Sequence, residues 1–260
     1  MPLDHASALT PTASIAHFSH VKSGLLRKVW RAVLVVAVVA LVGPFVLALP
    51  LNFVQPLTTM VMLRRTVQRL FADKSPAYPR RDIVGHDEIS DNLRRAVLAS
   101  EDDRFYLHYG FDLTEIENAI ERAKRGRKLR GASTITQQVA KNLFLWEGRS
   151  FVRKGYEAYL TLVLEVCLSK DRILDIYLNL AEWGDGVFGA EMAAQTHYRK
   201  SAKSLTRDEA ARLAAILPAP QRWSPRGSIA SRRASTILAR MQYAAPREAP
   251  PEPARKPKRS

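Results

Sequence analysis

Residues 100–112 read Ser-Glu-Asp-Asp-Arg-Phe-Tyr-Leu-His-Tyr-Gly-Phe-Asp and directly follow the apolar, helix-spaced residues Leu93, Val97 and Leu98. The stretch gathers acids, an arginine, a histidine and aromatic rings, which a helix needed only for packing would not contain. A carboxyl group beside aromatic surface loses hydration, and this raises its pKa toward the range of proton exchange at neutral pH. Two interpretations are open here: a solvated helix end, or an acid/base site.

The chain has 260 residues and a formal net charge of +15, which is enough length for one sizeable domain with appendages. Basic segments at residues 1–31 and 247–260 carry only part of this charge, so the middle of the chain is itself basic. Such a surface favours anionic partners: lipid headgroups, phosphorylated substrates or nucleic acid. The single cysteine, Cys167, excludes an internal disulfide and fits the core side of a helix.

A long uncharged segment covers residues 32–63, and residues 32–51 are apolar throughout. About 20 apolar residues cross the ~30 Å hydrocarbon core of a bilayer as a helix. The run is too long, and begins too far into the chain, for the apolar region of a signal peptide. We therefore expect a transmembrane anchor at residues 32–54, in which Pro44 and Pro50 are tolerated as kinks or ends.

Charge on the flanks of this segment predicts its orientation. Lys22, Arg27, Lys28 and Arg31 precede it, whereas the nearest cation after it is Arg64. The positive-inside bias places residues 1–31 in the cytoplasm and the chain from residue 64 outside it. We expect the folded domain at residues 64–245 and a disordered basic tail at residues 246–260.

Helical periodicity and capping signals recur along the folded part, and no segment alternates with a period of two. The fold class is therefore expected to be mainly α, with few and short strands. Capping boxes begin at Thr114, Thr134 and Thr206, each with Glu or Gln three residues later. With the apolar spacing they predict helices from Thr114 to Gly126, Thr134 to about Leu145, 151–168, 172–179 and Thr206 to Pro218, and a last one starting near Pro225.

Two segments between these helices can bind an anion. Six cations lie within residues 122–130, directly before Gly131-Ala-Ser-Thr-Ile-Thr-Gln-Gln-Val-Ala-Lys-Asn142. A charge run is usually a solvated face, but hydroxyls and free amides at a helix start, followed one turn later by further donors, favour substrate binding. Further on, Arg153 and Glu157 share a helix face, either as a weak surface ion pair or as a phosphate clamp in which Glu157 orients cations or holds a metal ion.

The balance of acids and cations distinguishes two reaction types. A glycosidase protonates a poor leaving group, so it needs a carboxylic acid and a second carboxylate or base. Transfer from a sugar diphosphate needs cations on the leaving group and one base on the attacking hydroxyl. One acid-rich stretch and many cations favour the transferase, and a membrane anchor suits a lipid-linked donor.

Five blocks, in this order, resemble the peptidoglycan glycosyltransferase family and its monofunctional, membrane-anchored branch. The resemblance implies a lysozyme-like helical domain that polymerises lipid II into glycan strands, with inversion and release of polyprenyl diphosphate. The blocks are Glu101-Asp-Asp-Arg-Phe-Tyr-Leu-His-Tyr-Gly110, Gly131-Ala-Ser-Thr-Ile-Thr-Gln-Gln138 with Lys141-Asn142, Arg153-Lys-Gly-Tyr-Glu157, residues 170–189 with Tyr177-Leu-Asn179 and Glu182-Trp-Gly-Asp-Gly186, and residues 210–220.

The resemblance also implies roles for single residues. Glu101 would be the general base for the acceptor 4-hydroxyl, and Glu157 a second catalytic acid near the diphosphate, with no obligatory cofactor, no fixed metal site, and room for Mg²⁺ or Mn²⁺. Expected partners are lipid II, the growing strand, the membrane and cell-wall synthesis proteins, not nucleic acid. The expected location is the inner membrane, with a periplasmic domain. Substrate-contacting positions match Ser133, Thr134, Gln137, Gln138, Lys141, Asn142, Arg153 and Lys154.

Some features depart from the family pattern or stay open. Ala132 replaces a frequent second glycine, and Arg199, expected on a loop, replaces a commoner small residue. The transpeptidase signature Ser-x-x-Lys occurs only at residues 19–22, before the anchor, and Lys-Thr-Gly is absent, so no transpeptidase activity is expected. Two alternatives remain: a lysozyme-like hydrolase or lytic transglycosylase, and an inert anchored module that binds lipid or cell-wall polymer.

The other acids of the opening stretch have less defined expected roles. Asp102 and Asp103 either orient Glu101 or face water, and His108 and Asp112 are expected to form its scaffolding.

Overall fold

A computed structural model describes residues 13–71, 77–126, 133–146, 148 and 150–244, with only the backbone described for residues 13–25. It divides into two compact units, residues 1–47 and 48–260. Several sequence-based expectations concern positions outside the described residues. These are the cations after Gly126, Ala132 and the disordered tail.

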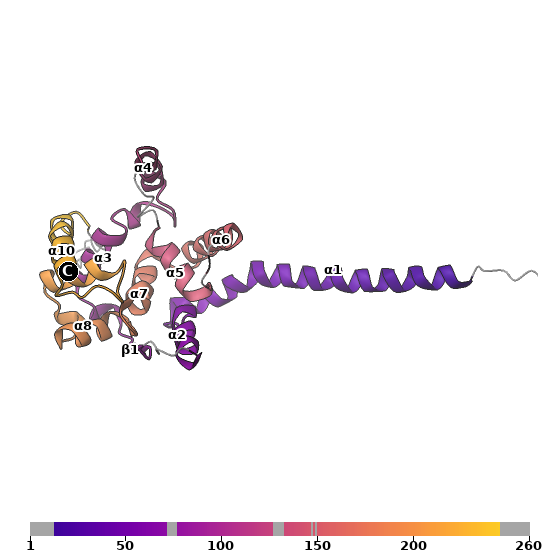
Figure 1. The fold of residues 1–260 in the computed structure, drawn as a ribbon, viewed down its shortest axis with the longest axis horizontal. Helices are drawn as coiled ribbons and strands as arrows, with labels where there is room; N and C mark the ends of the chain where they lie inside the picture. Colours follow the sequence, from indigo (N-terminus) through magenta and orange to yellow (C-terminus); the bar gives the residue numbers. More distant parts are fainter. Residues whose placement is uncertain (1–12, 72–76, 127–132, 147, 149, 245–260) are drawn as a thin grey trace, which may run out of the picture. The chain divides into compact units, whose positions relative to one another are not determined.

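The first unit consists of helix α1, Ala13–Ala48, drawn in indigo in Figure 1. The helix continues through Pro44. The segment Leu26–Asn52 has a mean hydropathy of 2.9 and is the one candidate membrane span among the described residues. It contains most of the expected anchor, and its valines and leucines are largely exposed, as lipid-facing side chains are. The chain therefore carries a helix that fits a single-span membrane anchor.

The second unit is mainly helical, which confirms the predicted fold class. In the part of it that the structure describes, three short strands form one sheet in the order β1-β3-β2, with β1 parallel and β2 antiparallel to β3. In chain order the elements are η1 Leu49–Asn52, α2 Met60–Phe71, β1 Arg80–Arg81, η2 His86–Glu88, α3 Asp91–Glu101, η3 Phe105–Leu107, α4 Leu113–Lys124, α5 Ile135–Phe144, α6 Phe151–Cys167, α7 Lys170–Leu180, β2 Glu182–Gly184, β3 Val187–Phe188, α8 Ala190–Tyr198, η4 Ala202–Ser204, α9 Arg207–Ile216 and α10 Ser228–Arg240.

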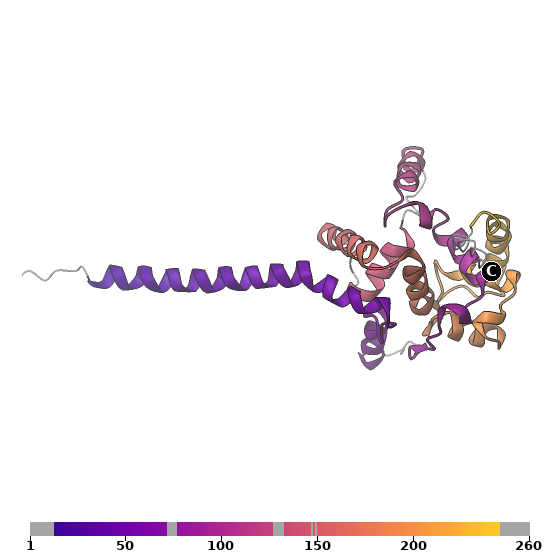
Figure 2. The same ribbon diagram turned by 180° about the vertical axis from the view of Figure 1, so that it is seen from behind.

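Helix α7 lies between α5 and α8 in the two opposite views of Figures 1 and 2. Its residues from Ile173 to Leu180 are all buried, as expected for a central helix that packs on every side. Helix α3 packs on α9, and α9 on α10. Both views show α4 standing apart from this group. The arrangement places the end of α3, the start of α5 and the middle of α7 near one another.

Capping chemistry explains where the helices begin. The predicted boxes at Thr134 and Thr206 are confirmed, since each threonine accepts from the backbone N–H three residues on and receives the reciprocal contact. The box predicted at Thr114 is wrong. The N-cap of helix α4 lies two residues earlier, at Asp112, whose side chain accepts from the Glu115 N–H at 3.0 Å. Aspartate is as good a cap as threonine, and here it comes first in the chain.

Other boundaries also differ in detail. Helix α10 begins at Ser228 after Gly227, three residues later than Pro225 suggested, because a turn intervenes. Gly126 follows the end of α4 with φ +75°, the left-handed backbone conformation that glycine commonly adopts after a helix. Helix α8 is short and alanine-rich, with no strong periodic signal, and it was not predicted. Arg199 ends α8 at φ 59°, a left-handed conformation that glycine, which has no Cβ, adopts without strain.

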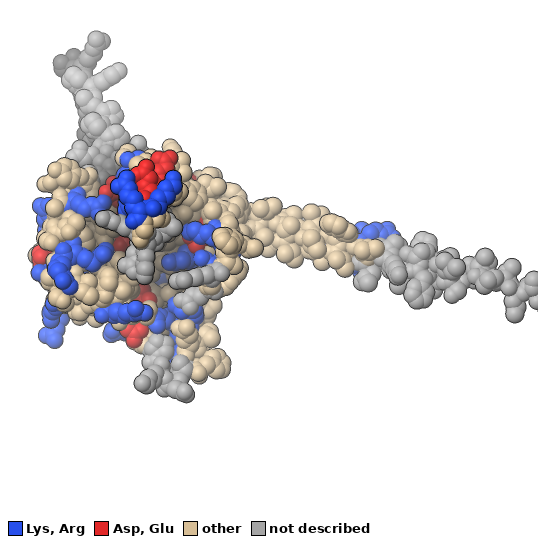
Figure 3. Space-filling model, turned by 45° about the horizontal axis from the view of Figure 1, so that its top comes forward, with Lys and Arg blue, Asp and Glu red and all other residues tan. Residues whose placement is uncertain are grey.

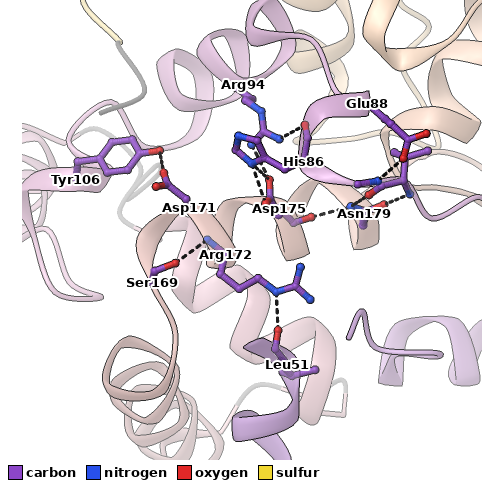
Figure 4. A network of polar contacts seen from close by, with 12 residues as sticks. Leu51, His86, Glu88, Arg94, Tyr106, Ser169, Asp171, Arg172, Asp175 and Asn179 are labelled. Atoms are coloured by element: carbon purple, nitrogen blue, oxygen red, sulfur yellow. Dashed lines mark hydrogen bonds and ion pairs between the residues drawn. The ribbon is translucent and has the colours of Figure 1, made fainter. Parts of the chain in front are cut away.

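A buried polar network joins α7 to residues 84–94 (Figure 4). Asp175 accepts from Arg94 Nη1 at 2.6 Å and lies 3.0 Å from His86 Nδ1, while Arg94 Nη2 donates to the His86 carbonyl. The side chains of Arg94 and Asp175 are only 3% and 10% exposed. Asn179 pairs with both backbone groups of Val84. The start of α3 is therefore held on α7 by an ion pair with little access to water.

Replacing Asp175 by alanine is expected to destabilise the domain by about 3–5 kcal/mol, because the Arg94 guanidinium would stay buried without its counter-ion. Urea denaturation of the full chain in detergent, followed by circular dichroism, measures this loss. The matched control is Asp208→Ala, which removes the exposed Asp208–Arg212 pair and should cost less than about 1 kcal/mol. Equal losses in the two variants would contradict the role given to the Arg94–Asp175 pair.

Candidate active site

Glu101 is the last residue of α3, and its carboxylate receives hydrogen bonds from neutral donors. Gln138 Nε2 on α5 donates to Glu101 Oε2 at 3.0 Å. The Ser100 hydroxyl lies 3.2 Å from both Glu101 Oε1 and the Ala214 carbonyl on α9, so its proton serves either acceptor. Loss of hydration raises the pKa of Glu101, whereas Gln138, Ser100 and the positive charge of Arg233 oppose this rise. A carboxylate of this kind can accept a proton from a substrate.

Asp102 connects the end of α3 to the start of α5. Its Oδ1 lies 2.9 Å from His108 Nε2, and its Oδ2 accepts from the Ile135 N–H at 3.0 Å. Asp102 is therefore buried and structural, which answers the question left open by the sequence. Asp103 is more exposed and pairs with Arg240 on the surface.

The remainder of the opening stretch is a junction between helices. Asp112 caps α4 and pairs with Arg104 at 3.2 Å, and neither it nor His108 touches Glu101, so their scaffolding is indirect. Gly110 adopts φ +79°, and a Cβ there would lie 2.6 Å from Thr161 Cγ2 of α6. Its carbonyl accepts from the Thr134 hydroxyl at 2.7 Å. Only glycine at position 110 allows the loop before α4 to pack this closely against α5 and α6.

Ligand atoms of Asp102, His108 and Asp112 lie within 4.8 Å of one another. The carboxylates are already engaged by a guanidinium and by backbone N–H groups. These residues therefore do not fit a divalent cation, and we assign none to them.

Helix α5 presents the predicted binding segment in two parts. Thr134 and Gln137 form the buried capping box, which gives both a structural role, whereas Ser133 is exposed beside them. Gln138, Lys141 and Asn142 line a cavity of about 170 Å³ together with Tyr177, and Lys141 and Asn142 also line a cavity of about 930 Å³. A third cavity of about 200 Å³ contains Glu101, Ser133 and Thr134.

Glu157 lies on α6 at 4% exposure, so its contact with Arg153 is not the surface ion pair that one interpretation of the sequence allowed. Arg153 Nη1 lies 2.9 Å from Glu157 Oε2, and Lys154 contacts Oε1. Both carboxylate oxygens are occupied, and among the described residues no second acid joins them. The site therefore does not fit a protein-bound divalent cation, and instead fits a carboxylate that orders two cations.

Lys141 faces this group from α5. Loss of hydration, followed by the charges of Arg153 and Lys154, lowers the pKa of Lys141, while Glu157 and Glu101 raise it. Among the described residues, no acid forms an ion pair with Lys141. Within the described part of the chain, Lys141 is thus a cation available to a ligand.

The largest of the three cavities has two kinds of wall. Lys141, Arg153 and Arg64 supply positive charge, and Leu63, Val67, Leu145 and Trp146 supply apolar surface. Lys and Arg are also more frequent than acids on the face of the molecule in Figure 3. An amphiphile with an anionic head fits such a cavity, because each of its parts finds a matching wall.

Three residues at the site were not singled out from the sequence. Ser100 and Tyr177 lie inside or beside the motif blocks, but only the fold shows that Ser100 reaches Glu101 and Tyr177 reaches Gln138. Arg233 stands over the Trp223 ring at 5.5 Å and donates to the Ala215 carbonyl. Arg233 is one of several arginines in α10, so the sequence gave no reason to single it out.

A carboxylate desolvated by burial, a cavity lined by cations and apolar side chains, and an apolar helix long enough to span a membrane are together the features expected of a membrane-anchored enzyme of glycosyl transfer. The sequence model of the transglycosylase family matches residues 67–242. The chain belongs to this family, whose domain is lysozyme-like.

Similar proteins carry the name biosynthetic peptidoglycan transglycosylase. The protein of Pseudomonas syringae pv. syringae (strain B728a) is 46% identical over 220 residues, which cover 84% of this chain and 91% of the relative. The protein of Pseudomonas entomophila (strain L48) is 48% identical over 213 residues, 81% of this chain and 88% of the relative.

Burial of Glu101 predicts a cost in stability. Because its pKa is higher in the folded than in the unfolded protein, the folded state binds more protons, and stability falls as the pH rises through this range. Glu101→Gln should therefore melt at a higher temperature than the wild type at pH 7, and the gap should close below the pKa of an unfolded glutamate. Thermal unfolding between pH 4 and 8 measures it. Glu117→Gln, an exposed change on α4, should show no such gap, and a wild type more stable than Glu101→Gln at pH 7 would contradict the assignment.

Proposed function

We propose that this protein polymerises lipid II into glycan strands, with Glu101 as the general base and polyprenyl diphosphate as the leaving group. The observation that carries the proposal is the position of Glu101, hydrogen-bonded to Gln138 on the same helix that carries the available cation Lys141. On α5 the donor to the base, Gln138, and an anion-binding cation, Lys141, are one turn apart, and together with Glu101 they match the two needs of transfer from a sugar diphosphate. The activity in the names of the similar proteins supports it.

In this mechanism Glu101 accepts the proton of the acceptor sugar's 4-hydroxyl as its oxygen attacks the anomeric carbon of the donor. Burial strengthens Glu101 as a base, and the donors around it keep its ionised form accessible. The carbon–oxygen bond to the diphosphate breaks on the opposite face, so the configuration inverts.

The leaving diphosphate would be held by Lys141, Arg153 and Lys154, with Asn142 as a further donor. Glu157 orders Arg153 and Lys154 and compensates part of their charge, leaving a net positive site. Ser133 and Gln138, at the start of α5, line cavities beside Glu101 and would contact the sugars. Diphosphate is stable as an anion, so this geometry needs no proton donor for it.

A lipid-linked substrate requires a catalytic domain at the membrane surface. Phe151, Val152, Leu162 and Val166 on α6 are exposed and apolar, with Phe151 at 98% exposure. They lie on the helix that carries Glu157, and an apolar face of this kind enters the interfacial region of a bilayer. With the basic flank before the span, these features support an inner-membrane protein with a periplasmic domain.

Glu101→Gln is expected to lower the rate of lipid II polymerisation by about 10²- to 10⁴-fold, the usual contribution of a general base. Its affinity for lipid II should stay close to that of the wild type. Asp208→Asn, an exposed acid on α9, controls for the loss of a charge. An inert binding module would lose nothing in Glu101→Gln, and a hydrolase would release fragments from preformed sacculi instead of lengthening glycan.

Lys141→Met is expected to weaken lipid II binding and turnover together, by about 10- to 100-fold, because a charge-assisted contact to the diphosphate would be lost. Surface plasmon resonance and glycan synthesis in detergent measure the two effects. Lys200→Met is the matched control, since Lys200 pairs with Glu209 at 3.0 Å on another part of the domain. A Lys141 variant with unchanged affinity would remove Lys141 from the diphosphate site.

A further inference from the structure

We propose that Tyr177 is a positioning residue for the general base: its hydroxyl holds the amide of Gln138 in the orientation that presents an N–H group to Glu101. The inference rests on the proposed function, in which Glu101 removes the proton of the acceptor hydroxyl. Tyr177 would act through Gln138 and would not touch the reacting atoms.

Three side chains from three helices form one hydrogen-bonded series. Tyr177 on α7 donates its hydroxyl proton to Gln138 Oε1 at 3.2 Å, and Gln138 Nε2 donates to Glu101 Oε2 at 3.0 Å. The tyrosine is 1% exposed, so its hydroxyl has little access to bulk water. The bond from Tyr177 is long for a hydroxyl donor, and its effect should therefore be moderate.

The orientation of the amide matters because its two ends have opposite hydrogen-bonding character. An ionised carboxylate only accepts, so a turned amide would place its carbonyl oxygen against Glu101. The same turn would take the carbonyl away from the Tyr177 proton, which has no other acceptor among the contacts of the described residues. Tyr177 thus favours the orientation that stabilises the ionised base.

The electrostatic surroundings of both partners agree with this direction. Burial, followed by the charges of Glu101 and Asp102, raises the pKa of Tyr177 well above its ordinary value, so the hydroxyl remains a donor. Other groups also act on Glu101: Ser100 and Asp102 from α3, Arg233 from α10 and Lys141 from α5. None of these groups bonds the Gln138 amide, and replacing Tyr177 leaves them in place.

The test is the pH dependence of lipid II polymerisation by the full-length protein at saturating substrate. Without an oriented N–H donor the ionised form of Glu101 is less stabilised, so its pKa rises and the acidic limb of the rate moves to higher pH. For Tyr177→Phe we expect a shift of about half a pH unit, which is about a threefold lower rate on that limb. KM and the high-pH plateau should stay within about twofold of the wild type, and an unmoved limb would overturn the inference.

A double variant shows whether Tyr177 acts through Gln138. Gln138→Leu alone should shift the limb further than Tyr177→Phe, because the donor itself is lost. The double variant Tyr177→Phe/Gln138→Leu should have the limb of Gln138→Leu. Shifts that add would mean that Tyr177 acts on Glu101 by another route and would contradict the proposal.

Two further proteins complete the test. Tyr198→Phe removes another partly buried hydroxyl, one without a hydrogen-bond partner among the described residues, and should keep the wild-type limb. Incorporation of 3-fluorotyrosine at position 177 keeps the ring shape and makes the hydroxyl a stronger donor, so the limb should move to lower pH even if Tyr177→Phe folds poorly. No shift, or an upward one, would count against the inference.

The outcomes also separate this inference from the proposed function. A wild type that makes no glycan from lipid II contradicts the function itself. A wild type that makes glycan, with Tyr177 variants that keep its acidic limb, contradicts only the positioning role.

Discussion

The carboxylate of Asp102 is the contact on which the site depends. One oxygen pairs with His108, and the other accepts the first N–H of α5, so the end of α3 and the start of α5 meet at one side chain. Glu101 precedes this residue, and Gln138 follows one turn into α5. Because the backbone at both places is fixed by the same group, Glu101 and Gln138 meet without a long flexible connection. The N-terminus of α5 also favours a negative charge, which contributes to holding Asp102 there.

Two buried or partly buried glutamates have different surroundings, and these suit different tasks. Glu101 has the neutral donors Gln138 and Ser100 beside it and feels the charge of Arg233, and burial raises the pKa of its carboxyl group. Glu157 is instead enclosed by two cations that occupy both oxygens. The first arrangement leaves a carboxylate that can take up a proton, and in the second the carboxylate orders the two cations beside it. The sequence does not distinguish the two glutamates, whereas their neighbouring side chains in the folded domain do.

Sequence reasoning succeeded where the signal is local. The capping boxes at Thr134 and Thr206 and the helix over residues 151–168 follow from neighbouring side chains, and the structure confirms them. The start of α4 was misplaced because Asp112 and Thr114 are both good caps, and only tertiary contacts such as Asp112 with Arg104 decide between them. The burial of Glu157 and the contact of Tyr177 with Gln138 depend on packing between helices far apart in the chain, which periodicity does not encode.

The polar groups around α7 show why such contacts are kept in a core that could be apolar. Asp175, Tyr177 and Asn179 lie within two turns of one buried helix, and each bonds a different segment: Arg94 of α3, Gln138 of α5 and the backbone of Val84. An apolar contact tolerates sliding, whereas a buried hydrogen bond fixes a register, because a displaced partner would leave a polar group unpaired. Helices α3 and α5, which carry Glu101 and Gln138, are therefore both fixed to α7 by directional hydrogen bonds. Apolar packing supplies the stability of this domain, and the buried polar contacts on α7 set the relative positions of Glu101 and Gln138.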